Sequence, residues 1–365
     1  MEYRECVVEN LVGKTHFWQE RKVFVTGHTG FKGSWLSLWL NLLGAKVTGY
    51  ALESQANSLF TSAGIDQFVD SLPGDIRNFE YLTDVLAACQ PEIVFHLAAQ
   101  SLVRFSYNDP VATFATNVMG SVNLLEAVRQ TGSVKAVVIV TSDKCYENQE
   151  WVWGYREQDP MGGHDPYSAS KGCAELAAGA YRRSFFHAGT PAMATVRAGN
   201  VIGGGDWSAD RIVPDIVRAV SRGQAVQVRN PNAVRPWQHV CEPLHGYLLL
   251  AEQLFCHGKE FAEAWNFGPD DDGARSVAWL VDYVCRKWGE GANWSHDGRQ
   301  HPHEANYLKL DCSKARAMLG WRPRLDGATA LDWTIEWYRE SLKGGSARSL
   351  TEQQILRYLD LLGNE

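Results

Sequence analysis

The stretch VTGHTGFKGSWLSLWLNLLG, from Val25 to Gly44, decides the fold. It spaces three glycines three residues apart, at Gly27, Gly30 and Gly33, between a β-branched run and an apolar pattern of helical spacing. Glycines let a backbone turn tightly and approach a pyrophosphate, and the following helix supplies amide donors and the positive end of its dipole. A strand, a glycine-rich turn and a helix therefore predict a dinucleotide site. The alternative is a turn that only lets helix and strand pack closely.

Short apolar runs alternate with amphipathic stretches along most of the chain. We expect buried strands at Lys22–Thr26, Lys46–Tyr50, Pro91–Leu97, Lys135–Thr141 and Ala192–Arg197. We expect helices at Phe31–Leu43, Phe114–Arg129 and Pro166–Phe186. Strands that are apolar throughout are covered on both faces, which is typical of parallel sheets. The fold class predicted is α/β, with a Rossmann-type, doubly wound parallel sheet and a smaller, interwoven C-terminal substrate domain.

The composition of the sequence changes after Asn200, where the chain becomes rich in glycine, then in proline and arginine, and later in tryptophan. A helix near Ser276–Trp288 and others after Cys312 are expected there. We predict an N-terminal extension over residues 1–20. The dinucleotide-binding domain then takes residues 21–200 plus about 235–260, and the substrate domain takes about 201–234 plus 261–365. Most tryptophans are expected to pack in the core.

Composition excludes several classes of function. The 365 residues carry a formal net charge of −7 and no long basic run, which disfavours nucleic acid and anionic membranes as partners. There is neither an apolar stretch of about 18 residues nor a signal-peptide core, so a cytoplasmic protein without a membrane span is expected. The eight cysteines are scattered without a CxxC pair, which favours free thiols and no metal site.

The second predicted strand bears on the choice of cofactor. An acidic residue at its end would bind the ribose 2′-hydroxyl of NAD, whereas a basic residue would accommodate the phosphate of NADP. Glu53 follows this strand and no lysine or arginine does, which favours NAD. Glu53 lies two or three positions beyond the expected strand end, however. A solvated loop charge is an equal alternative for this residue.

The segment YSASK, Tyr167–Lys171, places a tyrosine and a lysine on one helix face. We expect the ammonium of Lys171 to lower the phenol pKa from about 10, so that Tyr167 acts as a base near neutral pH. Such a base fits removal of a sugar hydroxyl proton while a hydride leaves the same carbon. Ser142, in the segment VTSDK, would hydrogen-bond the same hydroxyl. An ordinary exposed pair is the alternative.

The motifs GxxGxxG, GDI, HLAAQ, VTSDK, YxxxK and VRAGNVIGGGDW, taken in order, resemble the extended short-chain dehydrogenase/reductases. The resemblance covers nearly all of the chain from about Phe17 to Leu362. Within that superfamily the chain is similar to the nucleotide-sugar 4,6-dehydratases. The phrases GHTGFKGSWLSLWL, SDKCYENQEWVWGYRE and GGHDPYSASKGCAEL are closest to members that act on CDP-glucose. The resemblance implies a small-molecule nucleotide-sugar substrate and NAD, held tightly and regenerated in each turnover.

The resemblance also implies a reaction. Tyr167 takes the proton of the C4 hydroxyl while C4 passes a hydride to NAD⁺. The resulting ketone acidifies the C5 hydrogen, water is lost across C5–C6, and the hydride returns to C6 while C5 is reprotonated. The product would be CDP-4-keto-6-deoxyglucose, a precursor of deoxysugars in surface polysaccharides such as the lipopolysaccharide O-antigen.

Elimination requires an acid for the departing C6 hydroxyl and a base for C5. By resemblance, Asp143 matches the acid. Lys144 departs from the family's pattern, because the dTDP-glucose dehydratases have glutamate as the base at this position. A lysine is a base only if its pKa is lowered, and otherwise it would stabilise the enolate as a cation. The identity of the C5 base is left open.

Matching positions assign the other site residues. The catalytic set implied is Ser142, Asp143, Lys144, Tyr167 and Lys171. Besides Tyr167 and Lys171, the cofactor-binding set is Gly27, Thr29, Gly30, Phe31, Gly33, Asp75, Ile76, Leu97, Ala98 and Ala99. The substrate-binding set is Gln100, Asn117, Arg197, Asn200, Arg235 and His303. Asn117 also resembles the family's structural or relay asparagine. Arg235 matches the arginine that clamps the diphosphate, with a surface salt bridge as the alternative, and His303 and Glu304 lie near the positions that hold base and ribose. A homodimer formed through helices near Thr113–Arg129 and Tyr167–Phe186 is also implied.

Rival functions share parts of this pattern. A nucleotide-sugar epimerase has the same scaffold but needs no acid–base pair beside the serine. A reductase that consumes NADPH would need a basic residue after the second strand. A non-catalytic NAD-binding regulator would have little reason to keep Ser142, Asp143, Tyr167 and Lys171 together. Only the resemblance distinguishes a dehydratase for CDP-glucose from a dehydratase for dTDP- or GDP-sugars.

Overall fold

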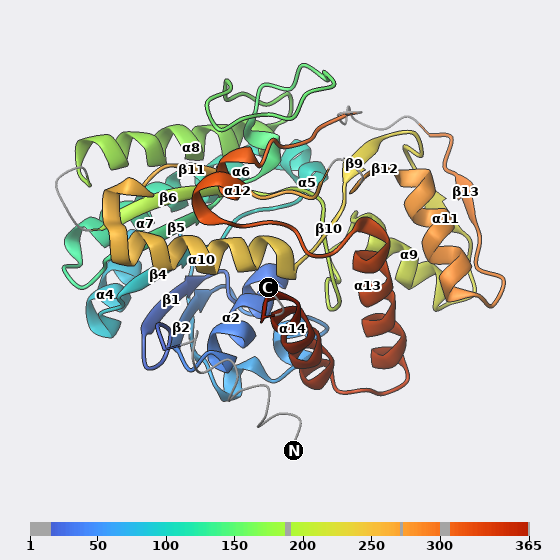
Figure 1. Ribbon diagram of the computed structural model, residues 1–365, viewed down its shortest axis with the longest axis horizontal. Coiled ribbons are helices and arrows are strands. Elements are labelled where there is room, and N and C mark those ends of the chain that lie inside the picture. The colour runs from blue at the N-terminus through green and yellow to red at the C-terminus, as the bar shows by residue number, and fades with distance from the viewer. Residues whose placement is uncertain (1–15, 187–190, 271–272, 300–306, 364–365) are drawn as a thin grey trace.

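The computed structural model describes residues 16–186, 191–270, 273–299 and 307–363. Its centre is a parallel sheet in the order β11-β6-β5-β4-β1-β2-β3 (Figure 1). Val25 in β1 pairs with Gly49 in β2 and with Phe95 in β4. This order confirms the Rossmann-type, doubly wound fold. The strands are β1 (Lys22–Thr26), β2 (Lys46–Ala51), β3 (Asp70–Pro73), β4 (Ile93–His96), β5 (Ala136–Val140), β6 (Ala192–Arg197) and β11 (Ala264–Asn266).

Helices cover both faces of this sheet, as Figure 1 shows. Val23 and Val25 point into the core beneath α2 (Phe31–Leu42) and α10 (Cys241–His257). Phe24, between them, joins the opposite core under α4 (Phe79–Cys89), α7 (Gly120–Gln130) and α8 (Pro166–Ser184). Every residue of β5 and β6 is buried. The continuous apolar runs in the sequence therefore reflect strands that are covered on both sides.

The predicted helix over Phe114–Arg129 is interrupted. Short helices α5 (Val103–Asn108) and α6 (Pro110–Phe114) lead into a π-helical turn over Ala115–Met119, and α7 begins at Gly120. Such turns insert one extra residue per turn and re-aim the side chains that follow. Apolar periodicity did not reveal this insertion. The remaining short elements of this half are α3 (Leu59–Ser62) and the 3₁₀ turns Ile65–Gln67, Asp143–Cys145 and Gly258–Glu260.

The C-terminal half adds three two-stranded pairs and further helices, most of them on the right of Figure 1. The pairs join β7 (Val201–Ile202) with β10 (Gln238–His239), β8 (Val226–Val228) with β13 (Trp294–His296), and β9 (Val234–Pro236) with β12 (Ala274–Ser276). The helices are α9 (Ile212–Val220), α11 (Val277–Trp288), α12 (Ser313–Leu319), α13 (Gly327–Leu342) and α14 (Ala347–Gly363).

One hydrophobic core runs through both halves of the molecule. Trp35 and Trp39 of α2 share a buried cluster with Trp321 and with Trp337 of α13. In addition, β11 joins the central sheet, although it lies beyond residue 260, where we placed the end of the dinucleotide-binding domain. The two parts are interwoven more closely than a boundary there suggests, and the domain division stays a prediction. No helix within the described ranges is long and apolar enough to cross a membrane.

Candidate active site

A cavity of about 880 Å³ opens at the carboxyl ends of the parallel strands. Its wall includes residues directly after β1, β4 and β5: Gly27, Leu97 and Thr141. The strand order reverses between β1 and β4, because β2 and β3 continue on one side and β4, β5 and β6 on the other. Ligands of open α/β sheets bind outside the carboxyl ends of the strands at such a switch point. The position of the cavity follows from the sheet topology.

The glycine-rich turn has no room for side chains. Gly27 has φ +73°, and a Cβ atom on it would lie 2.7 Å from the backbone nitrogen of Ala98. A Cβ atom on Gly33 would lie 2.1 Å from the carbonyl oxygen of Gly27. The turn therefore keeps bare backbone at the N-terminus of α2, where a pyrophosphate is favoured by amide donors and by the helix dipole. This cradle fits a dinucleotide cofactor.

All residues predicted to bind the cofactor line this cavity. They are Gly27, Thr29, Gly30, Phe31, Gly33, Asp75, Ile76, Leu97, Ala98, Ala99, Tyr167 and Lys171. Their contacts with a cofactor stay a prediction. Glu53, by contrast, is exposed and is absent from the described residues that form the wall. The structure thus favours the solvated loop charge over the ribose ligand for Glu53.

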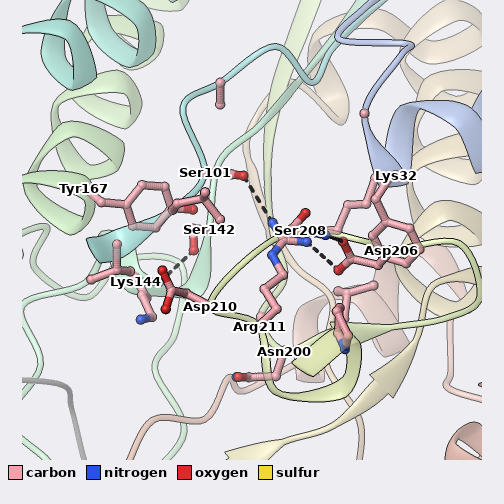
Figure 2. A pocket seen from close by; sticks show the side chains of 18 of the residues that line it. Lys32, Ser101, Ser142, Lys144, Tyr167, Asn200, Asp206, Ser208, Asp210 and Arg211 are labelled. Carbon is pink, nitrogen blue, oxygen red and sulfur yellow. Dashed lines mark hydrogen bonds and ion pairs between the residues drawn. The ribbon is translucent and has the colours of Figure 1, made fainter. Parts of the chain in front are cut away.

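The five predicted catalytic residues meet on one side of the cavity. Figure 2 shows Ser142, Lys144 and Tyr167 there, with Lys32 and Asp206 opposite and Arg211 between the two groups. Ser142 follows β5, and its hydroxyl accepts a hydrogen bond of 3.2 Å from the backbone nitrogen of Lys144. That contact caps the 3₁₀ turn Asp143–Cys145. The turn presents the hydroxyl, the carboxyl and the ammonium in succession.

Tyr167 and Lys171 come from the first turns of α8. The Asp165 side chain caps this helix by accepting from the backbone nitrogen of Ser168, and proline fixes its first position. Burial raises the pKa of the Tyr167 phenol to about 12, although its hydrogen bond with Ser142 acts in the opposite direction. We expected Lys171 to bring the pKa of Tyr167 below 10. In the structure this pKa is raised instead, because the effect of burial outweighs that of the neighbouring charges.

Lys171 is itself shifted by its surroundings. Its Nζ atom donates to the backbone oxygen of Val140, at 3.3 Å. Burial lowers the pKa of Lys171 to about 8, while Cys145 and Glu175 act to raise it. The ammonium is therefore held beside the end of β5, and its proton is less firmly bound than that of an exposed lysine.

Asp143 is almost fully buried at 2% exposure, and its two oxygens differ. Oδ1 accepts a hydrogen bond of 3.1 Å from the Ser142 hydroxyl. Oδ2 has no hydrogen-bond partner among the described residues. A Cβ atom on Gly199 would lie 1.7 Å from Oδ2, so only glycine fits behind this carboxyl group. A buried carboxyl oxygen without a partner at a cavity wall is suited to exchange a proton with a ligand.

Three of the predicted substrate residues do not belong to this wall. Among the described residues that form it, Gln100, Asn117 and Arg197 are missing. The Asn117 amide bonds the backbone of Gln100 and the hydroxyl of Ser170, which pins the π-helical turn to α8. Arg197 is paired with Glu175 inside the protein. The polar groups of all three residues are used by partners in the fold, and their assignment to the substrate stays a prediction.

The other residues assigned to the substrate either line the cavity or lie outside the described residues. Asn200 and Arg235 line the cavity, and Arg235 is 6% exposed. Arg235 also donates to the backbone oxygen of Val234. His303, and Glu304 beside it, lie outside the described residues. Among the described residues, no group of three or more histidine, cysteine or acidic side chains could hold a metal ion.

Sequence reasoning missed several cations of the cavity, among them Lys32 and Arg211. Arg211 bonds Asp206 at 2.9 Å and the Ser101 hydroxyl at 3.1 Å, and so spans the opening. Burial and the neighbouring charge of Arg211 lower the pKa of Lys32 to about 7, against an opposing effect of Asp143. Lys32 stands in the first turn of α2, directly after the glycine-rich turn, so the sequence already places it beside the predicted cofactor site. This position in the sequence was the signal that could have identified Lys32 as a residue of the site.

Comparison with known proteins separates this chain from others with the same fold. The model of the GDP-mannose 4,6-dehydratase family matches residues 24–332. The chain belongs to this family. It is 54% identical over 350 residues to the CDP-glucose 4,6-dehydratase of Salmonella typhimurium, covering 94% of this chain and 98% of that protein. The expected membership of the nucleotide-sugar 4,6-dehydratases is confirmed.

Solved structures share the fold of this family member. The dTDP-glucose 4,6-dehydratase of Bacillus anthracis in complex with NAD has a TM-score of 0.74 at 21% identity, covering 89% of this chain and 98% of that chain. The UDP-glucose 4-epimerase of Thermotoga maritima with UDP-glucose has a TM-score of 0.75 at 23% identity, covering 88% and 99%. Dehydratases and epimerases thus have one scaffold, and side chains must distinguish them.

Proposed function

We propose that this protein is an NAD-dependent hydro-lyase that converts CDP-glucose to CDP-4-keto-6-deoxyglucose. The observation that carries the proposal is the segment Ser142–Asp143–Lys144, which lies beside Tyr167 and lines the same cavity as the glycine-rich cradle. An oxidation followed by an elimination needs two sets of proton-transfer groups, and this cavity contains two. The 54% identity to a CDP-glucose 4,6-dehydratase supports the choice of substrate.

Tyr167 is the group that removes the proton of the C4 hydroxyl. Because burial raises its pKa to about 12, it needs nearby positive charge to act as a base near neutral pH. Arg211 contributes such a charge within the chain, since it lowers the phenol pKa. NAD, which the glycine-rich cradle would hold, would supply the hydride acceptor for C4, the hydride donor for C6 and the positive charge of its oxidised ring.

Asp143 and Lys144 serve the elimination. Asp143 is the acid for the C6 hydroxyl, because its buried Oδ2 has no hydrogen-bond partner within the described chain and lies at the cavity. Lys144 lines the same wall and stands next to it in the turn. We assign the proton of C5 to Lys144, which then returns a proton to C5 after the double bond is reduced.

The charged residues deeper in the cavity suit a diphosphate. Arg235 is nearly buried at the wall, and a guanidinium offers a planar fork for phosphate oxygens. Arg211 and Arg229 line the cavity as well, each paired with an aspartate at 2.9–3.1 Å. Their partners, Asp206 and Asp210, keep these cations in place before a phosphate arrives.

Isotope labelling tests this proposal. CDP-glucose carrying deuterium at C4 should give a 4-keto-6-deoxy product with the deuterium at C6, because the hydride removed from C4 returns to C6. In D₂O, unlabelled substrate should gain one deuterium at C5. Both labels are read by NMR and mass spectrometry. A C4 epimer that retains its C6 hydroxyl would instead make the protein an epimerase, and stoichiometric consumption of added NADPH would make it a reductase.

Assembly and cellular setting extend the proposal. Apolar side chains stand exposed on α6, the π-helical turn and α8: Val111 (78%), Leu176 (62%) and Met119 (52%). We propose that these helices pair two copies of the chain, because exposed apolar groups that gather on one face mark interaction sites. Light scattering should give twice the chain mass of 40.7 kDa. The described cysteines are free thiols, which supports a cytoplasmic setting and supply of deoxysugars for surface polysaccharides.

A further inference from the structure

One ion pair holds both ends of the turn that carries Asp143 and Lys144. Thr141, two residues before the turn Asp143–Cys145, donates a hydrogen bond from its hydroxyl to Glu175, with 2.5 Å between the oxygens. Tyr146, directly after the turn, accepts from Arg197 at 2.6 Å. Glu175 and Arg197 are themselves joined. The reactive turn is therefore a short loop whose two ends are fastened to a single buried pair.

The geometry of the pair is that of a fixed clamp. The Nε and Nη2 atoms of Arg197 donate to the two carboxylate oxygens of Glu175 at 2.8 and 2.9 Å, and each side chain is 4% exposed. Thr195 donates to the same carboxylate at 2.7 Å. Burial opposes ionisation of Glu175, but Arg197 and these hydrogen bonds outweigh it and hold its pKa below the ordinary value. Bidentate, charge-assisted bonds of this kind fix position as well as energy.

A second layer fixes Tyr146 itself. Its hydroxyl donates to Asn266 at 2.8 Å, and its ring stacks on Tyr155 with centroids 5.1 Å apart. The guanidinium of Arg197 lies 4.8 Å from the centre of the Tyr146 ring. Asn266 belongs to β11, the edge strand that joins the sheet from the C-terminal half. The end of the turn is thus tied to both halves of the protein.

The residues of this clamp do not line the cavity in which the reaction is proposed to occur. Glu175, Arg197 and Tyr146 are not among the described residues that line the cavity. Tyr167 and Lys171 are carried by α8 itself, whereas Asp143 and Lys144 depend on the turn for their position. Loosening the clamp should therefore displace the elimination groups more than the oxidation groups.

We propose that Glu175, Arg197 and Tyr146 are positioning residues for the elimination half of the reaction. They hold the turn Asp143–Cys145 so that its carboxyl group and its lysine amine meet the ketone formed by oxidation at C4. This inference rests on the proposed dehydratase function. It also gives a role to Arg197, whose guanidinium is unavailable to substrate. A displacement of about 1 Å at reacting groups costs up to ~10²-fold in rate.

The test uses Tyr146→Phe, which removes the hydroxyl link and keeps the stacked ring. The matched control is Tyr283→Phe, which removes a hydroxyl bonded to Asp332 at 2.9 Å; neither residue is among the described residues that line the cavity. After mixing with CDP-glucose and NAD, reduced nicotinamide should form in Tyr146→Phe at nearly the rate seen in the unmodified protein. Formation of 6-deoxy product should fall by ~10- to 100-fold, with KM unchanged.

A second measurement needs neither cofactor nor substrate. Hydrogen–deuterium exchange of peptides spanning residues 141–147 should speed up by ~10-fold or more in Tyr146→Phe, because the turn loses one anchor. Exchange elsewhere should match the control. Glu175→Gln should speed up exchange of the same peptides more strongly, because both ends of the turn lose their anchor. If Glu175→Gln does not fold, Tyr146→Phe still decides the question.

Two results would overturn the inference. One is a Tyr146→Phe protein in which elimination and exchange of the turn equal those of the control. The other is an equal loss of oxidation and elimination, which would show a general structural role. Failure of the dehydratase proposal itself is distinct, because the unmodified protein would then form no 6-deoxy product at all.

Discussion

At the scale of single residues, Asp143 shows how the fold keeps a polar group ready for a ligand. Its Oδ2 atom is buried and has no hydrogen-bond partner among the described residues. Leaving a buried acceptor unsatisfied costs about 1–3 kcal/mol. Gly199 is the residue that makes room for it, since a Cβ atom there would overlap the carboxyl group. The proton transfer that we propose for Asp143 would account for an aspartate kept at this cost at a cavity wall.

Replacement of Tyr167 by phenylalanine tests the oxidation step. The change removes the proton acceptor and keeps the ring, so turnover of CDP-glucose should fall by ~10²- to 10⁴-fold. Binding of NAD, measured by calorimetry, should be retained. Turnover within tenfold of the unmodified protein would show that another group removes the C4 proton.

Replacement of Lys144 by alanine separates the two halves of the reaction. Oxidation needs Tyr167 and Lys171, so reduced nicotinamide should accumulate on addition of CDP-glucose and absorb in the near ultraviolet. Little 6-deoxy product should form, and loss of a deuterium label from C5 should slow. If no reduced nicotinamide forms, Lys144 acts in binding or oxidation. Normal turnover with full exchange at C5 would place the base elsewhere.

The arginines mark the limit of sequence reasoning at this scale. Arg197 ends a predicted strand, and Arg211 follows a glycine-rich segment. Of the two, matching positions assigned only Arg197 to the substrate. Its partner Glu175 is 22 residues away on another element. No local pattern reveals that this guanidinium is already paired, or that Arg211 enters the cavity instead.

At the scale of elements, local signals were sufficient where the chemistry is local. Three glycines and the flanking strand and helix predicted the cradle, because tight turns depend on the residues within them. The strand Ala192–Arg197 was predicted with its observed ends. The π-helical turn over Ala115–Met119 was not predicted, because its extra residue is stabilised by Asn117 contacts with Gln100 and with α8.

The junction of α10 and α14 provides a pH-dependent test at this scale. Glu242 accepts bonds from the Tyr358 hydroxyl at 2.6 Å and from the backbone nitrogens of Arg324 and Leu325 at 2.8 and 2.7 Å. Burial raises the pKa of Glu242 to about 7. The folded protein therefore keeps a proton that the unfolded chain releases above about pH 4.5.

Stability from this proton is present at low pH and is lost as the pH rises from about 4.5 through 7. The loss amounts to about 3 kcal/mol at most, from the shift in pKa. Glu242→Gln imitates the protonated form, so its free energy of unfolding should decline less over this range. Urea unfolding at several pH values measures the difference. Glu80→Gln, an exposed control, should keep the original slope, and equal slopes in all three proteins would contradict the account.

At the scale of the whole molecule, the two halves are joined by the core and by the sheet. Trp35 and Trp39 pack in one cluster with Trp337, and the edge strand β11 pairs Asn266 with Arg197 of β6. Sequence patterning predicted the doubly wound fold because alternation of strands and helices fixes it. The contribution of β11 could not be predicted, since a three-residue strand has no periodicity and its pairing is set by distant residues.

The comparison of nucleotide sugars tests the central claim most directly. The protein should be supplied in turn with CDP-glucose, dTDP-glucose, GDP-mannose and UDP-glucose, with NAD present, and kcat/KM determined for formation of the 4-keto-6-deoxy product. The account predicts that CDP-glucose has the highest kcat/KM and that its product has lost the C6 hydroxyl. An equal or higher value for another nucleotide sugar, or a product that retains the C6 hydroxyl, would contradict it.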